Sequence, residues 1–314
     1  MRAVVYERNG GPEVLDVREV PDPEPADGEV LVDVEAVGVN FRDVYEREGR
    51  PPYTAAPPAV VGVEGAGTVV GTGERVAWLD VRGSYAERVA APRTKLVPVP
   101  DGVDAAVAAA VMLQGCTAQY LVADSYPVRE GEWTVVHSAA GGVGLLLTQL
   151  VRARGGHVLA TTSTEEKAEL ARAAGADDVV VGYQGFAERV RELSGGEGAA
   201  VVYDGVGRPT FAAGLTALRP TGRLILFGAA GGQPEPLELA QLAAHGSLYV
   251  QRPTLATYTR TPELLRKRAG AVLDLVAAGG LDVRIGGRYP LTDARRAQED
   301  LEGRRTTGKL LLLT

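Results

Sequence analysis

The stretch VVHSAAGGVGLLLTQLVRARG, residues 135–155, limits the possible folds of this chain more than any other segment. It has the pattern of a buried apolar strand, a glycine-rich turn and an amphipathic helix. Further strands alternate with helices after it, through HVLATTS, TEEKAELARAAG, DDVVVGY, FAERVRELSG, AAVVYDGVG and GRLILFGAAG. Such alternation predicts a parallel sheet with helices on both faces. We therefore predict the α/β fold class, with a doubly wound parallel sheet in this half of the chain.

The glycine turn within that stretch predicts a dinucleotide-binding site. Ala139 stands at the first position of the fingerprint, and Gly141 and Gly144 stand at the second and third. Backbone amides at the start of a helix donate hydrogen bonds to pyrophosphate, and the helix dipole favours its negative charge. The alternative is that the glycine turn only allows the helix to pack closely on the strand. Packing alone explains fewer of the small residues in this turn than the approach of a phosphate does. The predicted cofactor contacts at this turn are Ala140, Gly141, Gly142 and Val143.

The end of the next strand, TTSTEEK, favours NADPH over NADH. An enzyme that uses NAD carries an acid here to hold the ribose hydroxyls, whereas this chain has Thr162 and Ser163. The missing acid removes a repulsion from the 2′-phosphate, and Lys167 lies one helical turn further on. Ser163 followed by Glu166 also has the spacing of a capping box, which is compatible with a phosphate-binding Lys167. Tyr183, after the third strand, is a candidate for the adenine side or an ordinary surface tyrosine.

The first hundred residues predict a second, β-rich domain. Short β-branched runs such as RAVVYE, EVLVDVEAVGV and KLVPVP are separated by glycine and proline turns, which is typical of a barrel-like or folded sheet. A chain of 314 residues is long for one hydrophobic core, so two domains are expected. Residues 101–124 predict two helices broken near Gly115. The last strand, KLLLLT, needs a partner, which we expect in the first domain.

Composition argues against several classes of function. The formal net charge is −7 and lysine and arginine form no stripe, which argues against a nucleic-acid partner. No uninterrupted apolar stretch reaches the roughly 20 residues of a membrane span, and the N-terminus has no signal-peptide core, so we expect a cytoplasmic protein without a membrane partner. Cys116 is the one cysteine, so no internal disulfide forms, and we expect it to be a small packed residue. A zinc site made of carboxylates and three dispersed histidines is not expected.

The octapeptide GVNFRDVY, residues 38–45, follows a predicted strand and admits two interpretations. Asn40 with Asp43 three positions later has the spacing of a helix N-cap with an acidic N3 residue. The same segment gathers Asn40 and Tyr45 around an apolar Phe41, as the wall of an active site would. The local pattern alone favours the cap and leaves the second interpretation open.

Nearly the whole chain resembles the zinc-independent quinone oxidoreductases of the medium-chain dehydrogenase/reductase superfamily. The resemblance lies in GVNFRDVYEREG, GVEGAGTVVG, MLQGCTAQYL, HSAAGGVG, VVYDGVG, GSLYVQRPTL and TTGKLLL, which occur in this order. It implies a GroES-like catalytic domain over residues 1–113, completed by residues 250–314, and a Rossmann coenzyme domain over residues 114–249. It also implies NADPH in the cleft and a homodimer. Zinc-dependent relatives have cysteine where Asn40 stands and histidine where Val63 stands, so the resemblance implies no metal.

The resemblance also assigns roles to individual residues. Asn40 and Tyr45 line the site and are candidates to donate hydrogen bonds to the acceptor oxygen, with Arg252 a more distant third. Asp43 remains a capping carboxylate. The cofactor contacts implied beyond the glycine turn, Ser163, Lys167 and Tyr183 are Phe41, Tyr45, Thr117, Phe227, Gly228, Ala229 and Lys309.

Hydride transfer from NADPH to a quinone without zinc is therefore the preferred hypothesis. The cofactor carries the reactive hydride, so the protein has mainly to position the acceptor. Reduction of α,β-unsaturated ketones or aldehydes is the near alternative, because it needs the same geometry. A protein that binds NADPH without significant turnover is the alternative of another class.

Overall fold

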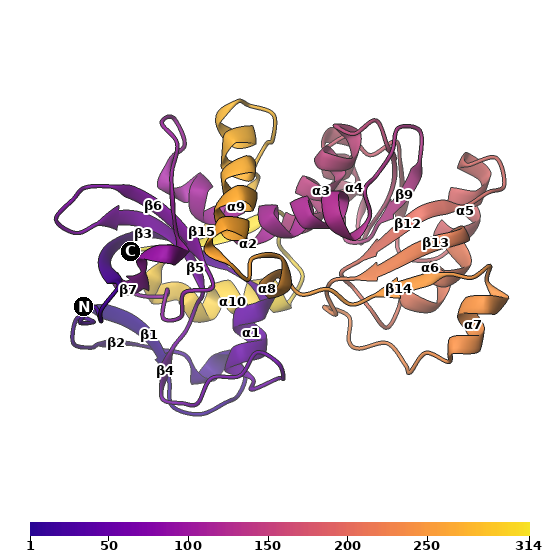
Figure 1. Cartoon of the computed structure of the whole chain (residues 1–314). Helices are drawn as coiled ribbons and strands as arrows, with labels where there is room; N and C mark the ends of the chain where they lie inside the picture. Colours follow the sequence, from indigo (N-terminus) through magenta and orange to yellow (C-terminus); the bar gives the residue numbers. More distant parts are fainter. The chain divides into compact units, whose positions relative to one another are not determined.

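The computed structural model describes residues 1–314, and the chain divides into two compact units (Figure 1). Unit 1 comprises Met1–Cys116 and Thr259–Thr314, and unit 2 comprises Thr117–Tyr258. The resemblance implied boundaries after residues 113 and 249. Strand β14, Tyr249–Gln251, pairs with β13, Leu218–Leu226, and so belongs to the sheet of unit 2.

Unit 2 contains one six-stranded sheet in the order β11-β10-β9-β12-β13-β14, and every pair of neighbours in it is parallel. The strands not yet given are β9 Trp133–Val136, β10 His157–Thr162, β11 Asp178–Val181 and β12 Ala199–Asp204. Strand order reverses at β9, so the neighbours β9 and β12 form the switch point at which doubly wound sheets bind ligands. The predicted doubly wound sheet is confirmed.

Helices cover both faces of this sheet. Helices α3 and α4 pack on β9, β10 and β11, whereas α5 and α6 pack together on strands of the sheet that include β9 and β12. The core between the layers includes Val135, Leu159, Val202 and Leu224, all fully buried. The helices of unit 2 are α3 Gly142–Arg152, α4 Glu165–Ala173, α5 Phe186–Leu193, α6 Phe211–Ala217, α7 Leu239–Ala244 and α8 Leu255–Tyr258.

Unit 1 is mainly β-structure, as the sequence predicted. A larger sheet has the order β15-β16-β3-β5-β6-β8 with β7 paired to β3, and a smaller sheet has the order β2-β1-β4. The strands are β1 Arg2–Tyr6, β2 Asp16–Glu19, β3 Glu29–Val39, β4 Ala59–Val60, β5 Glu64–Val69, β6 Arg75–Leu79, β7 Arg88–Pro92, β8 Leu96–Pro98, β15 Ile285–Pro290 and β16 Lys309–Leu313. The helices are α1 Phe41–Arg47, α2 Ala105–Tyr120, which runs on into unit 2, α9 Pro262–Ala277 and α10 Ala294–Glu302.

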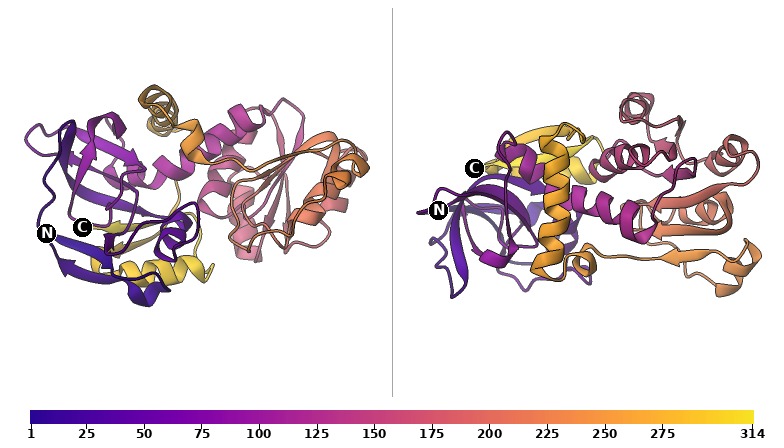
Figure 2. Two further views of the ribbon diagram at one scale, coloured as in Figure 1. Left: turned by 60° about the horizontal axis from the view of Figure 1, so that its bottom comes forward. Right: turned by 45° about the horizontal axis from the view of Figure 1, so that its top comes forward.

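The carboxy-terminal segment completes unit 1, and both chain ends lie in this unit (Figure 2). Strand β16 pairs antiparallel with β3 and parallel with β15. Leu310 and Leu312 from this strand join Val32 and Trp78 in one buried cluster. The predicted partner of the last strand is therefore β3, in the amino-terminal segment.

Helix α2 is continuous through Gly115, so the predicted break there is wrong. A Cβ on Gly115 would lie 2.6 Å from Cγ1 of Val272 and 2.7 Å from Cγ2 of Val111, which shows that the glycine allows α9 to pack closely. With the π-helix Leu121–Ser125 that follows it, the helical stretch Ala105–Ser125 is long and apolar enough to cross a membrane by length and composition. In this structure 67% of its most apolar window is buried, as in a core helix.

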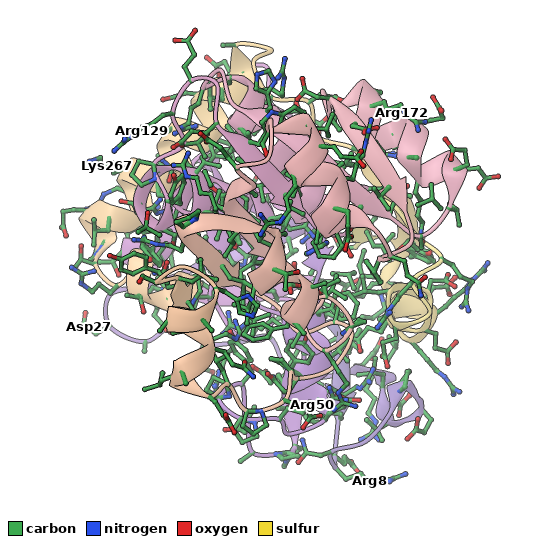
Figure 3. The ribbon with its side chains drawn as sticks, turned by 90° about the vertical axis from the view of Figure 1, so that its right-hand side faces the viewer. Arg8, Asp27, Arg50, Arg129, Arg172 and Lys267 are labelled. Carbon is green, nitrogen blue, oxygen red and sulfur yellow. The ribbon has the colours of Figure 1, made fainter.

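Charged side chains project outward from the helices and loops of both units (Figure 3). Arg172 on α4 bridges Glu165 and Glu169, with nitrogen–oxygen distances of 2.7 and 2.6 Å. Exposed pairs of this kind contribute little to stability.

Candidate active site

Asn40 is the N-cap of helix α1 and follows strand β3, which ends at Val39. Its backbone is extended, and its N–H donates to Oδ2 of Asp43 at 2.9 Å. The N–H of Asp43 donates in turn to the carbonyl oxygen of Asn40 at 3.0 Å. The capping role predicted for Asp43 is confirmed, and it fixes the direction in which α1 leaves the sheet.

The side chain of Asn40 belongs to a buried group that we call the Asn40–Glu64–Lys309 cluster. Nζ of Lys309 donates to Oε2 of Glu64 at 2.5 Å and to Oδ1 of Asn40 at 2.7 Å. Nδ2 of Asn40 donates to the same Oε2 at 2.7 Å and to the carbonyl oxygen of Gly38 at 3.1 Å. The three side chains come from α1, β5 and β16, and none is more than 4% exposed.

Glu64 was missed by the sequence analysis, although one signal was present. An acid inside the apolar strand pattern of GVEGAGTVV needs a cationic partner when it is buried. The resemblance implies Lys309 as a cofactor contact, and a lysine at the edge of a sheet is the ordinary alternative. Strand β16 has neighbours on both sides, so Lys309 is not at an edge, and its ammonium is held within the cluster. Its contact with a cofactor stays a prediction.

Asp43 carries the most unusual carboxyl group near this site. Burial raises its pKa from 3.8 to about 7, against the opposing effects of hydrogen bonds from the Tyr85 hydroxyl and the Asn40 N–H and of the nearby charge on Lys309. The hydroxyl of Tyr85 donates to Oδ2 at 2.9 Å, whereas the buried Oδ1 has no hydrogen-bond partner. Asp43 therefore changes charge near neutral pH.

Aromatic side chains form a second feature of α1. Tyr45 lies between Phe41 and Tyr53, with ring centroids 6.3 Å and 6.2 Å apart respectively, and it is stacked on Tyr53. The guanidinium of Arg50 lies 5.7 Å from the Tyr45 ring, and that of Arg42 lies 5.6 Å from the Tyr53 ring. The segment from Phe41 to Tyr53 therefore gathers three aromatic rings and two guanidinium groups that interact with the rings.

The glycine turn of unit 2 has the geometry that a pyrophosphate requires. Strand β9 ends at Val136 and helix α3 begins at Gly142, so the amides of the first turn of α3 lie next to the switch point of the sheet. A Cβ on Gly144 would lie 2.4 Å from the carbonyl oxygen of Ser138 and 2.7 Å from Cα of Ala139, both backbone atoms. Only glycine allows this close approach of helix and strand, so the residues present fit a dinucleotide.

The next strand end carries the polar residues expected near a ribose. Ser163 is exposed after β10, and Nζ of Lys167 lies 3.3 Å from its Oγ. The N-cap of α4 is Thr164, whose Oγ1 accepts the N–H of Lys167 at 3.3 Å. The capping box predicted for Ser163 and Glu166 is therefore wrong by one residue, and the hydroxyl of Ser163 is not used to cap α4.

Tyr183 follows β11 and contacts His137, which follows β9, with an edge-to-face geometry and ring centroids 6.1 Å apart. His137 is buried, and burial lowers its pKa from 6.5 to about 4. Its Nδ1 lies 2.9 Å from Oγ1 of Thr161, and its Nε2 has no partner. His137 is therefore a buried, neutral packing residue at this edge of the sheet.

The remaining predicted residues of unit 2 lie in α2 and at the ends of β13 and β14. Phe227, Gly228 and Ala229 follow β13, and a Cβ on Gly228 would lie 2.8 Å from the carbonyl oxygen of Gly205. Nη1 of Arg252, just after β14, donates to the carbonyl oxygen of Leu226 at 3.0 Å. Thr117 lies within α2, at the first residue of unit 2.

The carboxyl ends of parallel strands share one edge of a sheet. That edge of unit 2 therefore gathers the glycine turn, Ser163, Lys167, Tyr183, Phe227–Ala229 and Arg252. Asn40, Phe41, Tyr45 and Lys309 belong to unit 1.

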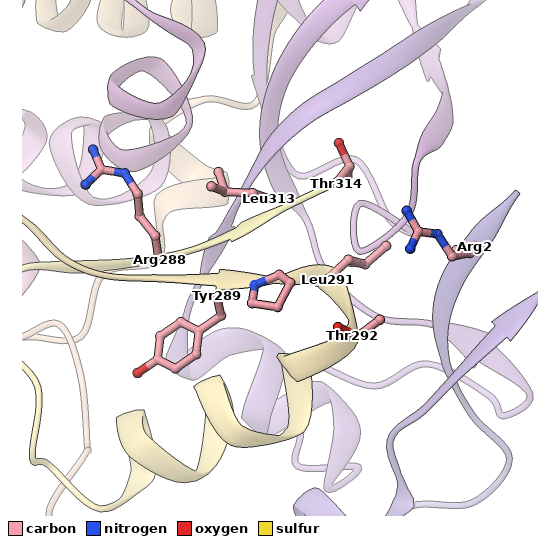
Figure 4. Close-up of a pocket in the computed structure, with 8 residues that line it drawn as sticks. Arg2, Arg288, Tyr289, Leu291, Thr292, Leu313 and Thr314 are labelled. Carbon is pink, nitrogen blue, oxygen red and sulfur yellow. The ribbon is translucent and has the colours of Figure 1, made fainter.

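A surface hollow of about 430 Å³ lies elsewhere on unit 1, beside β15 and β16 (Figure 4). Its lining includes Arg2, Arg288, Leu291 and Thr314. None of the predicted site residues lines this hollow, so it is separate from the features described above.

The two sequence-family matches fall on the two kinds of domain seen in the fold. Residues 26–101 match the alcohol dehydrogenase GroES-like domain, and residues 142–269 match the zinc-binding dehydrogenase domain. With a β-rich unit and a doubly wound unit in this order, the chain belongs to the medium-chain dehydrogenase/reductase superfamily. Within it, relatives named quinone oxidoreductases that match over almost the whole chain show that it belongs to the quinone oxidoreductase family.

Individual relatives match over almost the whole chain. A quinone oxidoreductase of Pseudomonas aeruginosa is 41% identical over 99% of this chain and 99% of its own. A 2-haloacrylate reductase of Burkholderia is 37% identical over 99% of this chain and 98% of its own. The crystal structure of Escherichia coli quinone oxidoreductase complexed with NADPH is 35% identical, covers 100% of both chains and has a TM-score of 0.95.

The residues present do not fit the metal named by one of the matching domains. No group of three or more histidine, cysteine, aspartate or glutamate side chains lies close enough together to hold an ion. Asn40, where zinc-dependent relatives have cysteine, instead bonds to Lys309 and Glu64.

Proposed function

We propose that this protein is an oxidoreductase that transfers hydride from NADPH to a quinone without zinc. The observation that carries the proposal is the carboxyl edge of the unit 2 sheet. There a glycine turn fit for pyrophosphate stands beside a strand end with Ser163 and Lys167 in place of an acid. The quinone oxidoreductases that match over their full length, one of them complexed with NADPH, support the same cofactor and acceptor.

The residues of unit 2 would hold NADPH by its phosphates and rings. Ala140, Gly142 and Val143 would offer backbone amides to the pyrophosphate. Gly141, whose own N–H donates to the carbonyl oxygen of Ser138, would let the phosphates approach the backbone closely. Ser163 and Lys167 would bind the 2′-phosphate. Tyr183 would lie on the adenine side, and Thr117 and Phe227–Ala229 would line the nicotinamide. Phe41, Tyr45 and Lys309 of unit 1 are also proposed as cofactor contacts. When bound, NADPH supplies the hydride.

Asn40, Tyr45 and Arg252 are the residues proposed to face the acceptor. As hydride reaches the quinone, negative charge develops on its oxygens, and a hydrogen-bond donor placed there lowers the barrier, a role that falls to Tyr45 and Arg252. Asn40, predicted as a donor, already uses both N–H groups of Nδ2 on Glu64 and on the carbonyl oxygen of Gly38, so its oxygen is the atom that it can offer. The stacked Tyr45 and Tyr53 rings match a flat aromatic acceptor. One hydride and one proton convert the quinone to its hydroquinone, and water is a sufficient proton source.

Reduction of α,β-unsaturated carbonyl compounds is the second candidate, and the 37% identical 2-haloacrylate reductase is the observation that favours it. Hydride then goes to the β-carbon and a proton to the α-carbon. Both reactions use the same cofactor site. They differ in which atom of the acceptor lies next to the nicotinamide.

NADPH oxidation against 1,4-naphthoquinone, 9,10-phenanthrenequinone and a panel of enones tests the proposal, with NADH run in parallel. We expect the quinones to be reduced faster than the enones. Faster enone reduction would favour the second candidate. Binding of NADPH without oxidation by any acceptor would contradict both enzyme activities and leave an NADPH-binding protein.

The choice of NADPH has its own test in Lys167→Ala. We expect Kd for NADPH to rise by roughly ten-fold or more, since a charge-assisted bond to a phosphate contributes about 1.5–3 kcal/mol. Kd for NADH should change by less than about two-fold. Equal losses for both cofactors, measured by quenching of protein fluorescence, would place the 2′-phosphate elsewhere.

We also propose a homodimer and a cytoplasmic location. Strand β14 is the edge strand of the unit 2 sheet, and its Tyr249 is 55% exposed, which is a suitable surface for a second copy. The only cysteine is a buried free thiol, which agrees with a reducing compartment. Light scattering of the purified protein, and of Tyr249→Lys, would report the mass of the assembly. Cell fractionation would report the location.

A further inference from the structure

The Asn40–Glu64–Lys309 cluster determines which way the Asn40 amide points. A lysine ammonium only donates hydrogen bonds, and a carboxylate only accepts them. The atom 2.7 Å from Nζ of Lys309 must therefore be the amide oxygen, and the atom 2.7 Å from Oε2 of Glu64 must be the nitrogen. The second N–H of that nitrogen donates to the carbonyl oxygen of Gly38 at 3.1 Å. Both N–H groups of Asn40 are thus in use.

The partners of Asn40 are themselves fixed by other elements. Oε1 of Glu64 accepts the backbone N–H of Leu113 in α2 at 2.5 Å, which leaves Oε2 for Lys309 and Asn40. Strand β3 makes room for them at Gly38, where a Cβ would lie 2.2 Å from Oε2 of Glu64 and 2.8 Å from Cε of Lys309. A cluster held by four elements and a glycine has little freedom to rearrange.

Stability alone does not explain this arrangement. Burying a carboxylate and an ammonium costs several kcal/mol of solvation, and apolar residues of similar volume often stabilise a core as well or better. The two charged groups fix the orientation of the Asn40 amide. An uncharged neighbour that can both donate and accept hydrogen bonds would bind the amide in either orientation. Lys309 can only donate and Glu64 can only accept, so they bind it in one orientation.

We propose that Glu64 and Lys309 are positioning residues that lock the Asn40 side chain, so that Asn40 offers its oxygen but no N–H to the reacting molecules. The effect of this lock on the reaction rate rests on the proposed function, whereas the fixed orientation of the amide is a property of the folded chain alone. Asn40 then acts as an acceptor, toward a hydroxyl of the cofactor or of the reduced product. The hydrogen bond to the acceptor oxygen comes from another donor, of which Tyr45 is the candidate on the same helix.

Hydrogen exchange at the Asn40 side chain tests the lock without any turnover. The two Nδ2 protons are assigned in ¹H–¹⁵N spectra by their loss in Asn40→Asp, and their exchange is compared with that of other asparagine side chains. We expect both protons to be protected in the wild type and to exchange at least roughly ten-fold faster in the double variant Glu64→Gln/Lys309→Met. Unprotected protons in the wild type, or unchanged protection in the variant, would overturn the proposal.

The double variant is used because each single substitution leaves an unpaired buried charge and is expected to destabilise unit 1. Its matched control is Glu132→Gln/Arg219→Met, which neutralises a partly buried ion pair of 2.6 Å in unit 2. We expect kcat with a quinone to fall at least about ten-fold in the first variant, with Tm no lower than in the control. The control should retain kcat.

The kinetic outcomes separate the two proposals. A double variant with lost amide protection but full kcat would show that the lock has no role in the reaction. The wild-type protein could also protect the Asn40 amide and yet fail to oxidise NADPH with any of the acceptors. That result would contradict the proposed function, but the fixed orientation of the Asn40 side chain would still stand.

Discussion

Asp43 and His137 are both buried, and burial shifts their pKa values in opposite directions because it disfavours the charged form of each. The folded chain raises the pKa of Asp43 from 3.8 to about 7, so the contribution of this group to stability is complete below pH 3.8 and is lost as pH rises through 7. It lowers the pKa of His137 from 6.5 to about 4, so that contribution is complete above pH 6.5 and is lost as pH falls through 4.

Replacing Asp43 by asparagine should remove the loss of stability that the wild type shows as pH rises through the pKa of Asp43. The oxygen of the new side chain still accepts the Asn40 N–H and the Tyr85 hydroxyl, whereas its NH₂ replaces the unpaired Oδ1. The rise in the pKa of Asp43 from 3.8 to about 7 corresponds to a loss of about 4 kcal/mol in the free energy of unfolding at high pH. The buried NH₂ of the asparagine, if it has no partner, costs about 1–3 kcal/mol. We therefore expect Asp43→Asn to unfold in urea with about 1–3 kcal/mol more stability than the wild type at pH 8. An advantage equally large at pH 4 would contradict the assignment.

His137→Asn should have the opposite pH signature. The asparagine oxygen can stand where Nδ1 stands and keep the contact with Oγ1 of Thr161. Wild-type stability should fall by about 3 kcal/mol between pH 6.5 and 4 through this residue, because the unfolded chain binds a proton there and the folded chain does not. In the variant, the free energy of unfolding should fall by about that much less over the same pH range. Parallel curves of unfolding free energy against pH for both proteins would show that His137 does not titrate in this way.

The residues near Asn40 show what local pattern could and could not reveal. The spacing of Asn40 and Asp43 predicted the start of α1, since capping acts over one turn of chain. The contact between Lys309 and Glu64 spans 245 positions and depends on the pairing of β16 with β3, so no local spacing pointed to it. Thr164 and Ser163 are both suitable caps, and only the position where β10 ends decides between them.

At the scale of elements, three glycines inside helices differ in what requires them. Gly144 is required by the backbone of the preceding turn, and Gly115 by the packing of α9 on α2. A Cβ on Gly270 in α9 would meet no neighbouring atom within 4 Å beyond its own helix backbone, so nothing in the structure requires this glycine. The fingerprint identified Gly144 because its neighbours are close in sequence. Gly115 was mistaken for a helix break because Val272 is far away in sequence.

Gly144→Ala should therefore weaken the dinucleotide site at its turn. The methyl group would meet the carbonyl oxygen of Ser138 at 2.4 Å, and a backbone atom cannot move aside without shifting the start of α3. We expect Kd for NADPH to rise roughly ten-fold or more, as measured by fluorescence quenching, since the phosphate depends on amides held in place.

Gly270→Ala is the matched control for that substitution. It should leave Kd unchanged and stabilise α9 by about 0.5–1 kcal/mol, because alanine has the higher helix propensity. Unchanged NADPH affinity in Gly144→Ala would mean that the first turn of α3 does not hold the phosphates.

At the scale of the whole molecule, unit 1 consists of two segments separated in sequence by all of unit 2. The strand pattern of KLLLLT predicted a need for a partner, because its leucines cannot all remain exposed. The identity of that partner depends on the closure of a sheet over more than two hundred residues of intervening chain, and periodicity carries no information about that. Unit 2 was easier to predict, because each strand is followed by the helix that covers it.

The last strand should accordingly control the stability of unit 1 and not that of unit 2. Leu311 in β16 is fully buried, and Leu311→Ala should cost about 2–5 kcal/mol. The two tryptophans report the two units separately, since Trp78 lies in β6 and Trp133 in β9. In a Trp133→Phe background, Leu311→Ala should lower the urea midpoint reported by Trp78. In a Trp78→Phe background, the midpoint reported by Trp133 should stay the same.

Leu159→Ala, at an equally buried position in β10, is the matched control and should produce the reverse pattern. NADPH at about 100 times its Kd should add about 2.7 kcal/mol to the transition reported by Trp133, because it binds the folded state. If Leu311→Ala shifts both tryptophan signals equally, the two units unfold as one cooperative structure. In that case the carboxy-terminal strand stabilises the dinucleotide-binding unit as well, and NADPH should raise the Trp78 midpoint by the same amount as the Trp133 midpoint.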